Sequence, residues 1–202
     1  TRLDDHGDLR IIGNQSPRYR YGVNLSARWN GIGLSVFLQG VGARDWYPGS
    51  DAGMFWGKYG RPFFALIPSI HNYTDDMYSA ERNNWDTAYW PRMTTYQSNG
   101  TKNWTRLLEI PNTRYIQSAA YLRVKNIQLD YSFPKHICSA IRLQGLKIYV
   151  NAENLFTFTP LHKYAPNFDP EGLSYDSDFA SAADGYTYPI LKSVTVGVNI
   201  TF

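Results

Sequence analysis

The last nine residues of the 202-residue chain alternate strictly between apolar and polar side chains. From position 194 they are V-T-V-G-V-N-I-T-F, so every second residue from Val194 to Phe202 is apolar or aromatic. Neighbouring side chains of a β-strand point to opposite faces, and this pattern therefore predicts a strand with one apolar and one polar face. Such a strand fits an outer-membrane barrel, whose apolar face meets lipid, and also the edge of an ordinary soluble β-sandwich.

Four further segments alternate in the same way. The first two flank Asn30-Gly31, a dipeptide that favours the type I′ turn of a minimal hairpin because that turn needs positive φ at both positions. In the third, the apolar positions change parity near Lys125-Asn126, which predicts a β-bulge. The five expected strands are 18–29, 31–41, 115–133, 143–155 and 190–202.

The connections between these strands alternate in length. Asn30-Gly31 and Pro134–Arg142 are short, whereas 42–113 and 156–189 are long. Outer-membrane barrels have short periplasmic turns and longer extracellular loops. The alternation therefore favours an all-β fold, an antiparallel transmembrane β-barrel segment, with both long loops outside the cell. Short helical turns are expected near Asp75–Asn84.

Several classes of protein are excluded by the composition. A net charge of +3 without any Lys/Arg block gives no indication of nucleic-acid binding. No apolar run approaches the roughly 20 residues of a membrane helix. The single cysteine, Cys138, rules out an internal disulfide framework and a cysteine-based zinc site. Since the chain opens at Thr1 without a signal peptide, we expect a processed or partial chain.

No catalytic constellation is found, and we expect a protein that is not an enzyme. The four histidines lack metal-binding spacing, and no cofactor is expected. The loop 156–189 offers carboxylates that suit a calcium ion. A solvent-facing acidic loop needs no ion, which is the alternative. The carboxylates concerned are Asp169, Glu171, Asp176 and Asp178.

The loop 42–113 contains five of the six tryptophans. Flat aromatic side chains with a polar rim bind sugar rings or peptides, so this loop is the candidate binding surface. The alternative is that the same side chains pack the loop against itself or against a partner protein. The residues singled out are Trp85, Asp86, Tyr89, Trp90, Arg92 and Tyr96. On the fourth strand, Lys147, Tyr149, Asn151 and Glu153 are expected to face the lumen.

Four long segments carry a resemblance to a known family. They are G-D-L-R-I-I-G-N-Q-S-P-R-Y-R-Y-G from Gly7, L-S-V-F-L-Q-G-V-G-A-R-D-W-Y-P from Leu34, N-T-R-Y-I-Q-S-A-A-Y-L-R-V-K-N-I-Q-L-D-Y-S-F-P from Asn112, and I-Y-V-N-A-E-N-L-F-T-F-T from Ile148. With Asp169–Glu171 and the terminal Phe202, the sequence resembles the C-terminal end of the SusC/RagA-like TonB-dependent outer-membrane transporters of Bacteroidetes.

The resemblance implies a plugged barrel of about 22 strands, of which this chain would supply the five C-terminal ones. It further implies an outer-membrane location, energy supplied through the TonB system, a SusD-like surface lipoprotein as lid, and import of glycans or peptides. Phe202 would serve as the assembly signal. The expected partners are therefore the remaining N-terminal barrel and plug, the lid, the TonB system, the cargo and lipid. The alternative function is a secreted β-sandwich carbohydrate-binding module.

Overall fold

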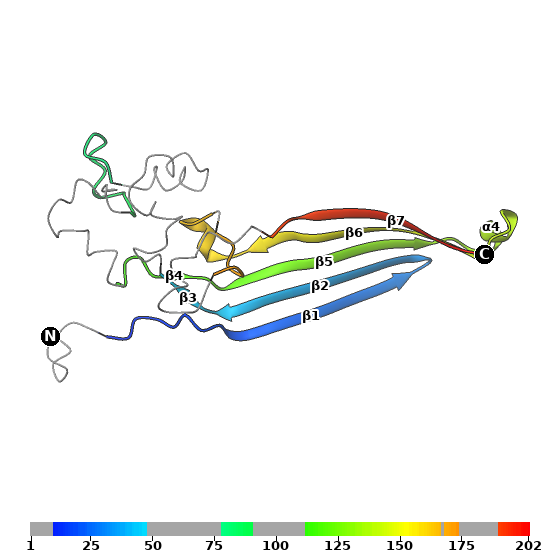
Figure 1. Cartoon of the computed structure of the whole chain (residues 1–202), viewed down its shortest axis with the longest axis horizontal. Coiled ribbons are helices and arrows are strands. Elements are labelled where there is room, and N and C mark those ends of the chain that lie inside the picture. Colours follow the sequence, from blue (N-terminus) through cyan, green and yellow to red (C-terminus); the bar gives the residue numbers. More distant parts are fainter. Residues whose placement is uncertain (1–9, 48–77, 91–111, 167, 174–189) are drawn as a thin grey trace. The chain divides into compact units, whose positions relative to one another are not determined.

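The computed structural model describes residues 10–47, 78–90, 112–166, 168–173 and 190–202 (Figure 1). The chain divides into two compact units. The strand unit consists of Arg18–Gly42, Ala120–Thr159 and Ile190–Phe202. The loop unit consists of Thr1–Pro17, Ala43–Ala119 and Pro160–Pro189. Within the described ranges, no helix is long and apolar enough to cross a membrane.

The strand unit is one five-stranded sheet in the order β1-β2-β5-β6-β7 (Figure 1). The pairs β2–β5, β5–β6 and β6–β7 are all antiparallel. The antiparallel all-β fold expected from the sequence is therefore confirmed for the described strands. The strands are β1 (Arg18–Trp29), β2 (Ile32–Ala43), β5 (Tyr121–Ser132), β6 (Gly145–Phe158) and β7 (Ser193–Thr201).

The turn between β1 and β2 has the predicted type I′ conformation. Asn30 and Gly31 both have positive φ, at 46° and 85°. A Cβ added to Gly31 would lie 2.7 Å from the carbonyl oxygen of Ser132, so glycine is also required for space. The backbone N–H of Ser132 donates to the Gly31 carbonyl at 2.8 Å and continues the β2–β5 ladder to the turn.

The predicted bulge near Lys125 is confirmed by the register of β5. Phe37 pairs with Asn126 and Leu38 with Val124, which leaves Lys125 as the extra residue. The neighbouring strand β6 has a matching irregularity that was not predicted, at Asn154, where φ is 52°. Beyond it, Phe156 pairs with Val124. Phe156 and Phe158 keep the even parity of Val150 and Ala152 and pair with Val124 and Leu122, and β6 continues to Phe158 instead of ending at 155.

The segment 115–133, which the sequence predicts as one strand, is divided in two. β4 (Gln117–Ser118) pairs with β3 (Asp45–Trp46) in the loop unit, and β5 begins only at Tyr121. Between them the N–H of Ala119 donates to the Arg44 carbonyl at 2.8 Å. The chain thus leaves one two-stranded sheet before it joins the larger one, because its backbone groups find different partners on either side of Ala119.

The short connection between β5 and β6 contains a helix, α4 (Lys135–Ala140), which the sequence analysis did not predict. Cys138 on this helix is 1% exposed, and its Sγ lies 3.7 Å from the carbonyl oxygen of Phe133, to which it donates. The cysteine therefore acts as a small apolar group that seats the helix on the end of β5. The strand ladder closes the connection, since Phe133 N–H donates to the Leu146 carbonyl at 2.9 Å, and Gln144 N–H donates to the Thr201 carbonyl at the end of β7 at 2.8 Å.

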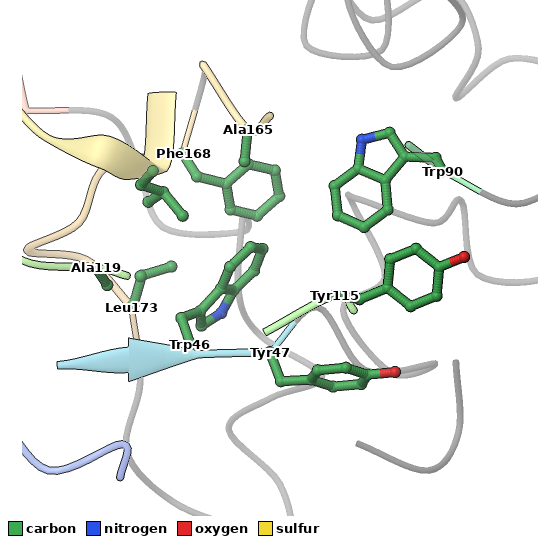
Figure 2. Close-up of a cluster of buried hydrophobic side chains, with 9 residues drawn as sticks. Trp46, Tyr47, Trp90, Tyr115, Ala119, Ala165, Phe168 and Leu173 are labelled. Atoms are coloured by element: carbon green, nitrogen blue, oxygen red, sulfur yellow. The ribbon is translucent and has the colours of Figure 1, made fainter. Parts of the chain in front are cut away.

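The loop unit has a core made mainly of aromatic side chains (Figure 2). A short 3-10 helix, η3 (Pro160–Lys163), contributes Leu161, which is fully buried. In the described part of the expected helical turns, Asn83 N–H donates to Ser79 O at 2.9 Å; residues 75–77 lie outside the described ranges. The core residues are Trp46, Tyr47, Trp90, Tyr115, Ala119, Leu161, Ala165, Phe168 and Leu173.

Candidate functional site

One face of the five-stranded sheet is apolar and exposed. On β7 the exposed fractions are 65% for Val194, 72% for Val196, 55% for Val198 and 50% for Ile200. Cross-strand partners continue this face onto the neighbouring strands, since Val198 pairs with Ile148. The other exposed members are Tyr19, Tyr21, Val23, Leu25, Trp29, Ile32, Leu34, Leu129, Ile148, Val150, Phe156 and Phe158. An apolar surface this extensive marks an interface with a protein or a membrane.

Aromatic side chains lie at both ends of this apolar face. At the end with the Asn30-Gly31 turn, Trp29 is 78% exposed and Phe202 81%. At the other end Tyr19 is 76% exposed, and Phe156 stacks with Phe158 at a centroid distance of 6.4 Å. Two aromatic girdles around an apolar band are typical of outer-membrane barrels, because the rings favour the level of the lipid headgroups.

The strand length also suits a bilayer. β1 and β2 each contain 12 residues. At about 3.3 Å per residue and a tilt of about 45°, a strand of that length rises roughly 28 Å, close to the apolar band of about 25 Å in outer-membrane barrels.

The opposite face carries a charged network. The Asp130 carboxylate is 6% exposed and accepts from Arg28 Nη2 at 3.0 Å and from Lys147 Nζ at 3.3 Å. Arg28 Nη1 also donates to Ser132 Oγ at 3.3 Å. Gly33 makes room for the network, since a Cβ there would lie 2.6 Å from Asp130 Oδ1. Two cations share one carboxylate on the face that the sequence pattern assigns to the lumen.

The other predicted lumen residues of β6 lie on this polar face. A Cβ at Gly197 would collide with the ring of Tyr149, so the glycine accommodates that ring. Glu153 Oε2 accepts from Ser193 Oγ at 3.2 Å. Asn151 Oδ1 is buried and has no hydrogen-bond partner among the described residues. A buried acceptor of this kind is normally satisfied by water or by another polypeptide segment.

The predicted aromatic binding residues divide into two groups. Trp90 is 1% exposed and stacks with Tyr115 at 5.5 Å, so it is part of the core. Tyr89 is half-buried, stacks on Tyr164 at 3.6 Å and donates its hydroxyl to the Arg114 carbonyl at 2.8 Å. These two residues therefore pack the loop 42–113 against Arg114, Tyr115 and Tyr164, which lie outside that loop, and their role in binding stays a prediction.

The remaining predicted residues differ from that pair. Trp85 is 73% exposed, and Asp86 beside it is exposed as well. Arg92 and Tyr96 lie outside the described residues. Trp85 and Asp86 are therefore the described members of the predicted set that present themselves to a partner, and their role in binding stays a prediction.

Two tyrosines of the loop unit have raised pKa values. Burial is the main cause for Tyr89, and the neighbouring Tyr164 and Tyr115 add to it; together they raise the pKa of Tyr89 to about 12, although Arg114 opposes the shift. Burial, followed by the proximity of Tyr115 and Tyr89, also raises the pKa of Tyr47. Both phenols are therefore neutral at physiological pH.

Arg44 is a structural residue that the sequence analysis missed. It is only 5% exposed, and its side chain donates to three backbone carbonyls, at 3.2 Å to Gln15, 3.0 Å to Pro170 and 2.7 Å to Leu173. It thereby ties segments from both ends of the loop unit to β3. The only sequence signal was its place in the G-A-R-D-W-Y-P motif, because a buried arginine cannot be told from an exposed one by local pattern.

The predicted calcium ligands are only partly described. Asp169 Oδ1 accepts from Glu171 N–H at 2.9 Å and so stabilises a turn, while Asp176 and Asp178 lie outside the described residues. Among the residues that are described, no group of three or more His, Cys, Asp or Glu side chains could hold a metal ion. Calcium binding stays a prediction.

No protein-family profile matches the chain. It is similar to TonB-dependent receptor P3 of Formosa agariphila, with 25% identity over 99% of this chain and 18% of that receptor. Receptors P26 and P39 of the same organism are 22% and 23% identical, over 96% and 99% of this chain. The chain spans about 18% of the length of these relatives.

Solved structures of the RagAB peptide importer have the same fold. In the open-open state the TM-score is 0.55 at 18% identity, over 96% of this chain and 18% of that one. In the closed-closed state the TM-score is 0.56 at the same identity and coverage. The resemblance to TonB-dependent receptors and to a RagA-like barrel, predicted from the sequence, is confirmed.

Proposed function

We propose that this chain, a segment similar to TonB-dependent receptors, forms five strands in the wall of an outer-membrane barrel that imports nutrients. The observation that carries the proposal is the two-faced sheet. Its apolar face leaves Val196 72% exposed, and its polar face holds the Arg28–Asp130–Lys147 network. Lipid on one side and a polar lumen on the other satisfy both faces.

The alternative of a secreted β-sandwich is disfavoured by the same face. In a sandwich, the apolar side of the sheet packs on a second sheet about 10 Å away. In the described part of the strand unit there is one sheet, and its valines on β7 are half exposed or more. Burying apolar surface contributes about 25 cal/mol per Å², so a water-soluble protein would not leave these side chains uncovered.

The edges of the sheet support a larger barrel. In the described chain, β1 and β7 are the outer strands. Backbone N–H and C=O groups without partners cost several kcal/mol each in lipid, and only closed barrels avoid that cost. Further strands of the same transporter would therefore pair with β1 and β7, and the resemblance implies about 22 strands in total.

The partners follow from the family resemblance and from the polar face. A plug domain would pack against the lumen face, where Asn151 Oδ1 is buried without a described partner. A SusD-like lipoprotein would cover the extracellular side, and the TonB system would supply energy through the plug. The chain itself performs no chemistry and contributes the wall and two outer loops.

The cargo is a peptide or an oligosaccharide. The structurally similar RagAB is a peptide importer, which favours peptides. The exposed Trp85 and its neighbour Asp86 suit either class, since an indole stacks on a sugar ring or packs on an apolar peptide side chain, and a carboxylate at its edge accepts hydrogen bonds.

Expression and fractionation test the proposal. In a transporter that has this chain as its C-terminal part, the protein should stay in the outer-membrane fraction and migrate as a heat-modifiable barrel. Residues 1–202 expressed alone should aggregate or fail to insert. A soluble, monomeric and cooperatively unfolding product from the 202-residue chain would contradict the proposal and favour the secreted module.

A further inference from the structure

The connection between β5 and β6 presents an exposed surface that the barrel wall does not explain. We define the α4 turn as Pro134–Gln144, which contains the helix α4. It lies at the same end of the strand unit as the C-terminus (Figure 1). Cys138 anchors it from below, whereas Ile137 is 40% exposed and Ile141 53%. The turn therefore places two partly exposed isoleucines at the surface of this end of the strand unit.

The charge of the turn has one sign. Lys135, His136 and Arg142 are all exposed. No aspartate or glutamate occurs between Tyr131 and Ala152, so no acidic side chain of that stretch neutralises them. The nearest lysine of β6, Lys147, is already paired with Asp130. Lys135 and Arg142 are therefore two exposed cations on the same turn that carries the two exposed isoleucines.

Arg142 occupies a position at which glycine would be less strained. Its φ is 60°, in the left-handed region. Leu143 N–H donates to Cys138 O at 2.9 Å and Arg142 N–H to Ser139 O at 3.1 Å, the two hydrogen bonds of a Schellman helix end. That position is usually glycine. An arginine here accepts backbone strain and places a permanent cation at the end of the helix.

The position of the α4 turn along the strands indicates the surroundings of its side chains. It begins directly after Phe133, whose ring contacts that of Tyr131 at 4.9 Å, and it returns next to Thr201 and the exposed Phe202. These aromatic residues and Trp29 mark the boundary of the apolar face. A segment just beyond an aromatic girdle lies at the level of the lipid headgroups, where apolar side chains reach acyl chains and cations meet phosphates.

We propose that the α4 turn binds the phosphate headgroups of anionic phospholipids through Lys135 and Arg142, with Ile137 and Ile141 in the adjoining acyl region. The inference rests on the proposed function, because it requires the strand unit to be embedded in a bilayer. It goes beyond that function in assigning a lipid class to one turn. Such a contact would extend the lipid-facing surface of the sheet beyond the girdle and would hold the periplasmic end of the barrel at a defined depth.

Photo-crosslinking in the assembled transporter tests this assignment. The photoreactive residue p-benzoylphenylalanine replaces Ile141, and the barrel is reconstituted in nanodiscs of mixed phosphatidylcholine and phosphatidylglycerol. Lipid adducts should form and should be enriched in phosphatidylglycerol. The same residue at Ser139, which lies about 200° around the helix from Ile137, should give few lipid adducts. Ile137 is the second labelling position if the Ile141 variant assembles poorly.

Charge variants then test the headgroup. Arg142→Gly removes the guanidinium together with the rest of the side chain and relieves the positive φ, so the turn should stay folded, whereas Lys135→Gln removes a charge and keeps a long side chain. Each of Arg142→Gly and Lys135→Gln should lower the preference for phosphatidylglycerol about fivefold, since one cation near an anionic surface contributes about that factor. Lys192→Gln, an exposed lysine outside the turn, is the matched control and should leave the preference unchanged.

The outcomes separate the two proposals. The first outcome is a heat-modifiable, membrane-embedded barrel that gives no lipid adducts at position 141 or 137, or gives adducts to another protein in their place. This outcome overturns the lipid contact but leaves the proposed transport function standing. Adducts without any preference for phosphatidylglycerol, or a preference abolished by millimolar inorganic phosphate, overturn the assignment to lipid headgroups. A protein that never enters the membrane fraction overturns the proposed function itself.

Discussion

The hydroxyl of Tyr21 on β1 donates to the backbone carbonyl of Tyr121 on β5, at 3.1 Å, across the whole width of β2. The side chain passes over Gly40, where a Cβ would collide with both the Tyr21 hydroxyl and the Tyr121 carbonyl. A glycine in the middle of a strand is usually destabilising. Here it lets one tyrosine link three strands at the end of the sheet opposite the Asn30-Gly31 turn.

Gly40→Ala should destabilise the barrel. The added methyl group displaces the Tyr21 ring and strains the β2–β5 ladder, at a cost of about 1–3 kcal/mol for an overpacked site. The measurement is the denaturant midpoint of the reconstituted barrel. Gly145→Ala is the control, since a Cβ there meets Thr201 at an ordinary 3.6 Å. Equal midpoints for the two variants would show that Tyr21 does not need the glycine.

Val196→Arg should impair assembly much more than Thr195→Arg. An arginine on the lipid face near the midplane costs about 2–4 kcal/mol, and one on the lumen side costs far less. Thr195 is a suitable lumen-facing position because it pairs with the uncharged Asn151. Asn199 faces the same side but lies directly opposite Lys147, so an arginine at that position would add like-charge repulsion. The readout is the amount of heat-modifiable barrel in the outer membrane. Equal losses from both variants would contradict the assigned faces.

Arg44→Lys should loosen the loop unit almost as much as Arg44→Ala. A lysine carries one point charge and cannot donate to Gln15, Pro170 and Leu173 at once, and each hydrogen bond from a charged group contributes about 1.5–3 kcal/mol. Limited proteolysis at 168–173 measures the effect, and Arg10→Ala, at an exposed arginine of the loop unit, serves as a surface control. If both Arg44 variants were cleaved as slowly as the wild type, the hydrogen bonds from Arg44 to the three carbonyls would not be needed to hold the loop unit together.

The packing of the loop unit should weaken in alkali. The pKa of Tyr89 is raised to about 12 in the folded state, against about 10 for an unfolded tyrosine. The neutral phenol is therefore the form that folding favours. Its contribution is complete below pH 10 and is lost as the pH rises toward 12. Tyrosinate absorbance and aromatic circular dichroism measure the transition. Tyr89→Phe should remove part of this pH dependence, and an identical profile in that variant would assign it to other tyrosines.

Trp85→Ala and Trp90→Ala should have opposite consequences. Trp90 is 1% exposed, and truncating a buried tryptophan costs about 3–5 kcal/mol, so the loop unit should lose its fold. Trp85 is 73% exposed, so its loss should leave stability unchanged and weaken cargo binding or lid association. Thermal unfolding and binding to peptides and oligosaccharides measure the two effects. If the Trp85→Ala variant bound cargo and associated with the lid as the wild type does, Trp85 would not have the predicted role in binding.

Local sequence alone determined the existence and the two faces of the five long strands, although not all of their bounds. The alternation from Val194 to Phe202 and the dipeptide Asn30-Gly31 were sufficient, because a strand has a period of two and a type I′ turn needs two positive φ angles. The parity change at Lys125 likewise predicted its bulge, since a bulge shifts the pattern of its own strand. These features depend on residues that are close together in the chain.

Tertiary structure decided what depends on distant residues. Nothing local distinguishes the buried Trp90 from the exposed Trp85, and their difference arises because Tyr115 and Tyr164 cover one of them. The same holds for Arg44, whose three acceptors are 29 to 129 positions away. Burial and hydrogen bonding follow from which segments meet in space, and a periodic pattern specifies the direction of a side chain but not its partner.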